Sequence, residues 1–281
     1  MSLATPSALE IGSRRFEWGR RTYVMGVVNL SPESFAGDGL AGASEAARQA
    51  ERFEREGADL IDVGGQSTRP GFAELSVEAE IERVVPAVRA LVAAVDLPVS
   101  IDTYRAPVAA AALAAGAHLV NDISGLRHDP EMAGLIGRAG VAAVVMHNQR
   151  ERPFHDVIGD IRAGLAESVA VAAKAGVRRD RLIVDPGFGF GWTVAQNMEM
   201  LRRLGELRDL GLPILVGTSR KSAIGTVLGR EEPGQRLWGT AATVALAIAN
   251  GADIVRVHDV REMTEVSRMT DAIVRPPRRR D

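Results

Sequence analysis

Eight short apolar segments of this chain each run into a polar residue of a type suited to binding or catalysis. The segments are YVMGVVNL, DLIDV, LPVSID, HLVND, VAAVVMH, RLIVD, LPILVGT and DIVRVHD. Their polar residues are Asn29, Asp62, Asp102, Asn121, His147, Asp185, Thr218 and Arg256. Most of the segments are continuously apolar, which is typical of strands covered on both faces, whereas half-solvated strands alternate.

Alanine-rich segments with helical periodicity separate these apolar segments, at residues 44–57, 77–95, 105–116, 158–176 and 194–210. Strand and helix in alternation predict an α/β fold with a parallel sheet, here a single (β/α)8 TIM barrel. Because every strand of such a barrel delivers its C-terminal end to one rim, the polar residues should converge on one pocket. Before the first strand, LEIGSRRFEWGRRT predicts an N-terminal β-hairpin with Gly12 and Gly19 near its turns, which would close the barrel bottom.

Length and composition favour one domain. The chain has 281 residues and no Ser/Gly/Pro-rich linker, while such a barrel takes roughly 250. We expect residues 1–22 to form the extension and hairpin, 23–275 the (β/α)8 barrel that binds the ligand, and 276–281 a solvated basic tail. An apolar content of 46% and a net charge of -2 exclude a disordered chain. The balance of 34 Lys+Arg against 36 Asp+Glu argues against a nucleic-acid partner.

The compartment is predicted from what the sequence lacks. No apolar stretch reaches the roughly 20 residues that span a bilayer, and the start MSLATPSALE does not resemble a signal peptide. We therefore expect a cytoplasmic protein with no membrane partner. Having no cysteine, the chain has no disulfide, thiolate metal site or cysteine nucleophile.

The loops after the second, third and fourth strands carry polar residues that each allow two interpretations. In GGQSTRPG, the guanidinium of Arg69 suits a phosphate, and an ion pair with Glu74 is equally compatible with the sequence. Asp102 and Asn121 could face a ligand or simply cap the helices that follow.

The last three loops allow similar alternatives. In DPGFGFG the glycines let backbone approach a flat ligand, while its two phenylalanines, Phe188 and Phe190, could be ordinary packing. VGTSRKS predicts Ser219 as a helix cap, with Lys221 and Ser222 in the first turn as an anion site. In RVHD, Arg256 and His258 should share a face and suit phosphate; the alternative is a buried ion pair with Asp253 or Asp259.

Taken together, the motifs from about Tyr23 to the last helix resemble those of the dihydropteroate synthase family. The motifs occur in family order: VVNLSPESF, DVGGQSTRPG, SIDT, VNDISG, VVMHN, DPGFGFG, VGTSRKS and RVHDV. The resemblance implies a transferase of folate biosynthesis. Such an enzyme joins p-aminobenzoate to 6-hydroxymethyl-7,8-dihydropterin pyrophosphate, releases pyrophosphate with the help of Mg2+, and forms a homodimer through its late helices.

The resemblance also implies roles for individual residues. The pterin would be bound by Asp102, Asn121, Met146, Asp185 and Lys221. The pyrophosphate would be bound by Asn29, which is also the implied magnesium ligand, with Thr68, Arg69, Arg256 and His258. The p-aminobenzoate would contact Phe35, Pro70, Phe190 and Ser222. The residues expected to act in catalysis are Asp38, Arg69, Lys221 and Arg256. Asp62, His147 and Thr218 are expected to support these residues rather than touch substrate.

The chain departs from the family pattern in three places. It has SFAGDG where SFSDGG is usual, which moves the carboxylate of Asp38 by one position. Gln66 replaces the usual Glu, and Trp192 and Thr193 follow DPGFGFG where a Lys is common. The altered first loop keeps open a catalytically silent pterin-binding paralogue. A methyltetrahydrofolate-dependent methyltransferase is a further alternative, but it would have no use for the residues assigned to pyrophosphate.

Overall fold

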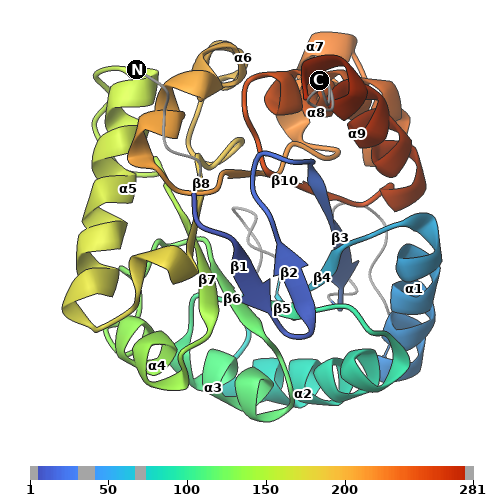
Figure 1. Ribbon diagram of the computed structural model, residues 1–281, viewed down its shortest axis with the longest axis vertical. Helices are drawn as coiled ribbons and strands as arrows, with labels where there is room; N and C mark the ends of the chain where they lie inside the picture. Colours follow the sequence, from blue (N-terminus) through green and yellow to red (C-terminus); the bar gives the residue numbers. More distant parts are fainter. Residues whose placement is uncertain (1–5, 31–41, 67–73, 276–281) are drawn as a thin grey trace, which may run out of the picture.

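Eight parallel strands form the centre of the molecule, and helices surround them (Figure 1). The computed structural model describes residues 6–30, 42–66 and 74–275. The strands of the main sheet are β3 (Tyr23–Asn29), β4 (Leu60–Gly64), β5 (Val99–Asp102), β6 (Leu119–Asp122), β7 (Ala142–Met146), β8 (Leu182–Asp185), β9 (Leu215–Val216) and β10 (Ile254–Val257). The α-helices are α1 (Ala43–Glu56), α2 (Val77–Ala94), α3 (Ala106–Ala114), α4 (Met132–Ala139), α5 (Val157–Lys174), α6 (Val194–Arg203), α7 (Ser222–Leu228), α8 (Leu237–Ala249) and α9 (Val260–Val274). Three 3-10 helices span Arg179–Arg181, Leu204–Leu210 and Pro233–Arg236.

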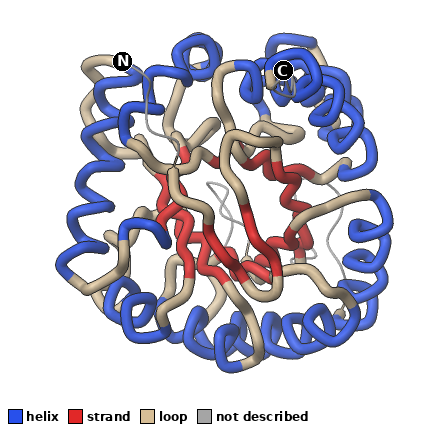
Figure 2. Tube along the Cα trace, in the orientation of Figure 1, coloured by secondary structure: helices blue, strands red, loops and turns tan. Residues whose placement is uncertain are grey.

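The strands close into a barrel. Their order in the sheet is β8-β7-β6-β5-β4-β3-β10-β9. The two ends of this order meet through a parallel bridge between Val184 and Ile214, where the Val184 N–H donates to the Pro213 carbonyl at 2.9 Å. Figure 2 shows the strands as an inner ring and the helices as an outer one. The predicted TIM barrel is therefore confirmed.

Local sequence explains where several helices begin. The side chain of Ser76 accepts from the Ala79 N–H at 3.1 Å at the start of α2, and that of Asp156 accepts from Gly159 at 2.8 Å before α5. At α6, Thr193 and Gln196 form a capping box. Such caps satisfy backbone donors that a helix leaves without an internal partner. The predicted helical segments agree with the structure, except that residues 204–210 are a 3-10 helix.

The core has two parts because strand residues alternate between the barrel interior and the helices. Between strands and helices lies the larger cluster, which includes Phe53, Val84 and Ile161. Gly26 lets Phe53 of α1 approach β3, since a Cβ there would lie 2.6 Å from the Phe53 ring. One face of each strand packs against helices and the other faces the barrel interior, which accounts for the continuously apolar segments.

The N-terminal hairpin and the lower barrel interior form the second cluster. Strand β1 (Leu9–Ile11) pairs antiparallel with β2 (Arg14–Phe16). The ring of Phe16 lies 4.7 Å from that of Tyr23, centroid to centroid, and packs with residues from the lower barrel interior. The hairpin crosses in front of the barrel in Figure 1. The hairpin buries the apolar floor of the barrel, at the end opposite to the rim that carries the polar residues.

Candidate active site

The centre of the rim is occupied by Arg256, on β10. Its Nε donates to Oδ2 of Asp62 at 2.6 Å, and its Nη2 donates to Oδ2 of Asp102 at 2.8 Å. Asn121 donates from Nδ2 to the same Asp62 oxygen at 3.0 Å. Four strands therefore contribute to one buried polar network, in which β4 supplies the carboxylate that joins an arginine to an amide.

Burial shifts the pKa values of this network. It raises the pKa of Asp102 to about 7, and the nearby negative charge of Asp62 adds to the effect although Arg256 opposes it. Burial opposes the charged form of Arg256, but Asp62 and Asp102 outweigh it and raise its pKa further. The Oδ1 atoms of Asp62 and Asp102 are buried and lack a hydrogen-bond partner among the described residues. A carboxylate oxygen in that state is ready to accept from a ligand or water.

A second polar group lies at the ends of β7 and β8. Met146 is paired in register with Asp185, so the two side chains share a face. Asp185 accepts from the Gly187 N–H at 2.7 Å, and its burial raises its pKa. Lys221 donates from Nζ to the Phe188 carbonyl, and burial lowers its pKa to about 7. A carboxylate and an amine with pKa values moved toward neutrality mark a candidate functional site.

An aromatic ring lies beside this group. The Phe190 ring has Lys221 Nζ at 4.3 Å from its centroid and the Arg150 guanidinium at 4.9 Å. Phe190 is half-buried, whereas Phe188 is buried in the core. The two phenylalanines thus divide between the predicted alternatives: Phe188 packs, and Phe190 remains available to a ligand.

The arrangement suits a flat, hydrogen-bonding molecule. Carboxylates and an amide from different strands come together at this rim, with an amine and an aromatic ring beside them. Among residues 6–30, 42–66 and 74–275, no group of three or more His, Cys, Asp or Glu side chains could hold a metal ion. In the same ranges no helix has the length and apolar character needed to cross a membrane.

Comparison with known proteins agrees with this chemistry. Residues 25–258 match the family model described as pterin binding enzyme. The chain is 45% identical over 278 residues to the dihydropteroate synthase of Synechocystis sp., covering 96% of both chains. With that of Bacillus subtilis it is 41% identical, covering 96% of this chain and 92% of the relative.

This chain belongs to the dihydropteroate synthase family. Solved structures of family members are also similar. The enzyme from Clostridium difficile, solved in the presence of pteroic acid, has a TM-score of 0.88 and 47% identity, with 92% of this chain and 99% of that chain covered. The Xanthomonas albilineans enzyme in complex with 7,8-dihydropteroate has a TM-score of 0.86 and 37% identity, with coverage of 96% and 99%. The resemblance to the dihydropteroate synthase family is therefore confirmed.

Five of the predicted site residues lie outside the described ranges: Phe35, Asp38, Thr68, Arg69 and Pro70. The structure brings together the residues predicted for the pterin, namely Asp102, Asn121, Met146, Asp185 and Lys221. Neither Asp102 nor Asn121 caps a helix, because α3 begins after Arg105 and α4 after Glu131.

The remaining predicted residues that the structure describes follow or end strands at the same rim, but one predicted helix cap is not formed. Asn29 ends β3, and Ser222 is the exposed first residue of α7. His258 follows β10 and bonds through Nδ1 and its backbone N–H to Ser219 Oγ, at 2.9 and 3.2 Å. The prediction that Ser219 caps a helix is wrong, because α7 starts after Lys221 and has no side-chain cap.

The alternative ion pairs suggested for Arg256 are also wrong. Asp259 pairs with Arg220, whose Nε lies 3.0 Å from Asp259 Oδ2. Asp253 accepts from the backbone N–H groups of Ile214 and Gly19. Arg256 pairs instead with Asp62, which lies within β4 rather than at its end.

For two further residues, Arg150 and Gln66, no role in the site was predicted from the sequence. Arg150 was not predicted, and its position in the loop after β7 was the only available signal. Gln66, the departure from the family's usual Glu, uses both ends of its amide: Nε2 donates to the Tyr104 hydroxyl at 2.9 Å, and Oε1 accepts from Leu75 at 3.1 Å. A carboxylate could not make the first of these bonds as a donor.

Proposed function

We propose that this chain condenses 6-hydroxymethyl-7,8-dihydropterin pyrophosphate with p-aminobenzoate to give 7,8-dihydropteroate and pyrophosphate. The observation that carries the proposal is the convergence of Asp102, Asn121, Asp185, Lys221 and Arg256 on one rim. The relatives named above carry this activity in their names, and the chain matches them over nearly its whole length.

Pterin recognition is assigned to the charged and amide groups of the pocket. The Asp185 carboxylate would accept from the adjacent amino and ring N–H donors of the pterin, and Lys221 would donate to its ring carbonyl. The buried Oδ1 of Asp102 and the side chain of Asn121 would pair with the remaining ring nitrogens. Met146 would pack against the ring face. Hydrogen bonds to charged groups of this kind contribute about 1.5 to 3 kcal/mol each.

Pyrophosphate binding is assigned to Asn29, Thr68, Arg69, Arg256 and His258. Two nitrogens of Arg256 already bond to carboxylates, and Nη1 forms no hydrogen bond with another described residue, which suits a phosphate oxygen. Asn29 offers one amide oxygen to Mg2+, and the described residues offer no carboxylate cage. That donor set fits an ion held mainly by phosphate oxygens and water. When bound, Mg2+ would neutralise charge on the pyrophosphate.

The reaction is proposed to begin with departure of the leaving group. The bond between the pterin methylene and the pyrophosphate oxygen breaks, and its electron pair leaves on pyrophosphate, whose charge Arg69 and Arg256 stabilise. The arylamine nitrogen then bonds to the methylene and loses a proton to water. An arylamine is largely unprotonated near neutral pH, so no strong general base is needed. Each tenfold in rate requires about 1.36 kcal/mol of preferential transition-state binding.

The p-aminobenzoate is assigned to Phe35, Pro70, Phe190 and Ser222. The Phe190 ring is half-buried, with the cationic groups of Lys221 and Arg150 at 4.3 and 4.9 Å from its centroid, and this setting supports a contact with the aromatic substrate. Asp38 would stabilise the positive charge that develops on the methylene.

A homodimer through the late helices is proposed as well, together with a cytoplasmic location. Large apolar side chains are exposed on neighbouring helices: Val227 and Leu228 of α7, Trp238 of α8, and Met269 and Ile273 of α9. Helices α7, α8 and α9 lie together at one corner of Figure 1. Trp238 is 80% exposed, which favours a partner surface over this helix face. Sedimentation velocity of the protein and of its Trp238→Arg variant tests this.

One assay tests the proposed reaction against its alternatives. The purified protein is mixed with the pterin pyrophosphate, p-aminobenzoate and Mg2+, and both dihydropteroate and pyrophosphate are measured. We expect both products in equal amounts. Pterin binding without turnover would instead indicate the silent paralogue, and methyl transfer from methyltetrahydrofolate to a corrinoid would indicate the methyltransferase.

The division between pterin and pyrophosphate residues has its own test. Arg69→Ala should lower turnover while leaving the binding of pterin without pyrophosphate unchanged, because the guanidinium is assigned to phosphate alone. If free pterin binding is lost too, the role of Arg69 is wrong. The control is Glu74→Ala, which removes an exposed carboxylate that pairs with Arg105. It should change neither the turnover nor the binding of free pterin.

A further inference from the structure

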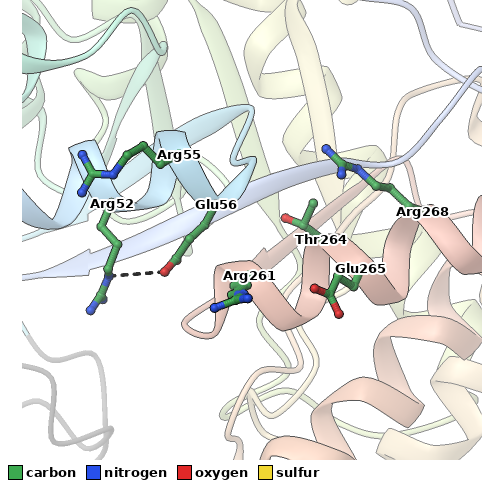
Figure 3. Close-up of a pocket in the computed structure, with 7 residues that line it drawn as sticks. All are labelled: Arg52, Arg55, Glu56, Arg261, Thr264, Glu265 and Arg268. Atoms are coloured by element: carbon green, nitrogen blue, oxygen red, sulfur yellow. Dashed lines mark ion pairs between the residues drawn. The ribbon is translucent and has the colours of Figure 1, made fainter.

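A cleft of about 410 Å³ lies on the outer surface between α1 and α9 (Figure 3). None of its lining residues belongs to the proposed active site. They are Arg52, Arg55 and Glu56 from α1, and Arg261, Thr264, Glu265 and Arg268 from α9. The cleft is large enough for a small molecule, since ligand pockets run from about 300 to 1,000 Å³.

Positive charge exceeds negative charge in the cleft. The lining contains four arginines and two glutamates, and one of these carboxylates, that of Glu56, is paired with Arg52 at 3.8 Å. Arg55, Arg261 and Arg268 form no hydrogen bond or ion pair within the part of the chain that the structure describes. Their donors are therefore available to an anion.

The floor of the cleft holds a polar atom that is buried without a partner. Thr264 is 5% exposed, and its Oγ1 has no hydrogen bond to any described residue. Figure 3 shows its hydroxyl directed toward α1 and Glu56. The helices approach closely there, because a Cβ on Gly57 would lie 2.9 Å from Thr264 Cγ2 and 3.5 Å from an Arg268 guanidinium nitrogen. A buried hydroxyl without a partner is costly, so a ligand oxygen that accepts from it would be stabilising.

We propose that this cleft binds a small polyanion with two or more phosphate groups, such as a free diphosphate or a nucleoside diphosphate. Guanidinium groups bind phosphate oxygens bidentately, and two helices presenting them from opposite sides suit a ligand with charge at both ends. Because the arginines are exposed, binding should weaken as salt rises. The proposal does not depend on the chemistry at the barrel rim.

Titration calorimetry with inorganic pyrophosphate and, separately, with ADP tests the proposal. Pyrophosphate should fill two sites per chain, one at the rim and one in the cleft. The double variant Arg261→Ala/Arg268→Ala should lose one of them, with affinity for that site falling at least about tenfold, while its synthase rate stays unchanged. ADP binding tighter than pyrophosphate in the cleft assigns a nucleotide, and equal binding assigns a free diphosphate.

The matched control is Arg89→Ala, which removes one exposed arginine from α2, outside the cleft. It should keep both sites. Thr264→Val preserves volume, removes the hydroxyl and should weaken cleft binding. A parent chain in which neither pyrophosphate nor ADP fills a site that the double variant loses overturns the proposal, as does a second site that survives in the double variant.

Discussion

Two replacements of Asp62 should show separately what its negative charge and its hydrogen bonds contribute to the buried polar network around Arg256. Asp62 is fully buried, and one of its oxygens accepts from both Arg256 and Asn121. In Asp62→Asn the amide oxygen can keep both bonds, and the new amide nitrogen takes the place of Oδ1, which has no partner among the described residues. Only the negative charge is then lost.

The magnitude follows from the partners that remain. Removing one member of a buried ion pair costs about 3 to 5 kcal/mol. Arg256 keeps Asp102 at 2.8 Å and its side chain is 21% exposed, so we expect about 2 kcal/mol for Asp62→Asn, below that range. Asp62→Ala also loses both hydrogen bonds and leaves a cavity, and should cost about 4 kcal/mol.

Urea unfolding and pterin titration measure the two effects. Asp62→Ala should weaken pterin binding more than Asp62→Asn, because it releases both Arg256 and Asn121. In Asp62→Asn the pKa of Asp102 should fall, since Asp62 is one of the charges that raise it. Asp253→Asn is the control: this buried carboxylate bonds to backbone away from the network, so stability should drop without a change in pterin binding. If Asp62→Ala is as stable as the parent, the bridging role is refuted.

Three further predictions concern the same rim. Burial lowers the pKa of Lys221 to about 7, so its ammonium is lost as pH rises through 7 and pterin affinity should fall; Lys221→Arg should bind more weakly at pH 6 but show no decline between pH 7 and 9. Burial lowers the pKa of His147 to about 4, so the folded state loses stability as pH falls from 6.5 toward 4. The unfolding equilibrium should change up to about tenfold per pH unit over this range. Unfolding of His147→Gln should lack this contribution, and equal acid sensitivity of the variant and the parent would contradict the assignment. In Gly187→Ala a Cβ would lie 1.9 Å from the His147 carbonyl oxygen, at a φ of +77°. We therefore expect the free energy of unfolding to fall by about 3 kcal/mol or more and pterin binding to be impaired. The control Gly176→Ala, with positive φ but open space around the Cβ, should lower it by only about 1 kcal/mol.

The sequence predicted the barrel because the relevant signals are local and repeated. Continuously apolar strands such as β7, alternating with helices, leave few other folds. The convergence of Asp102, Asn121 and Asp185 was also predictable, because the barrel topology carries every strand end to one rim. Their roles toward a pterin stay predictions, as do those of Phe35, Asp38 and Arg69, which lie outside the described residues.

The tertiary structure alone decided which polar groups pair with one another. Asp62 and Arg256 are separated by 194 residues, and their contact depends on the closure of the barrel rather than on either local sequence. Ser219 fitted the pattern of a helix cap, but the start of α7 placed it against His258 instead. Phe188 and Phe190 occupy one motif, yet only one lies in the core. Periodicity and strand order are encoded along the chain, whereas partner choice is set by distances across the barrel that no local pattern records.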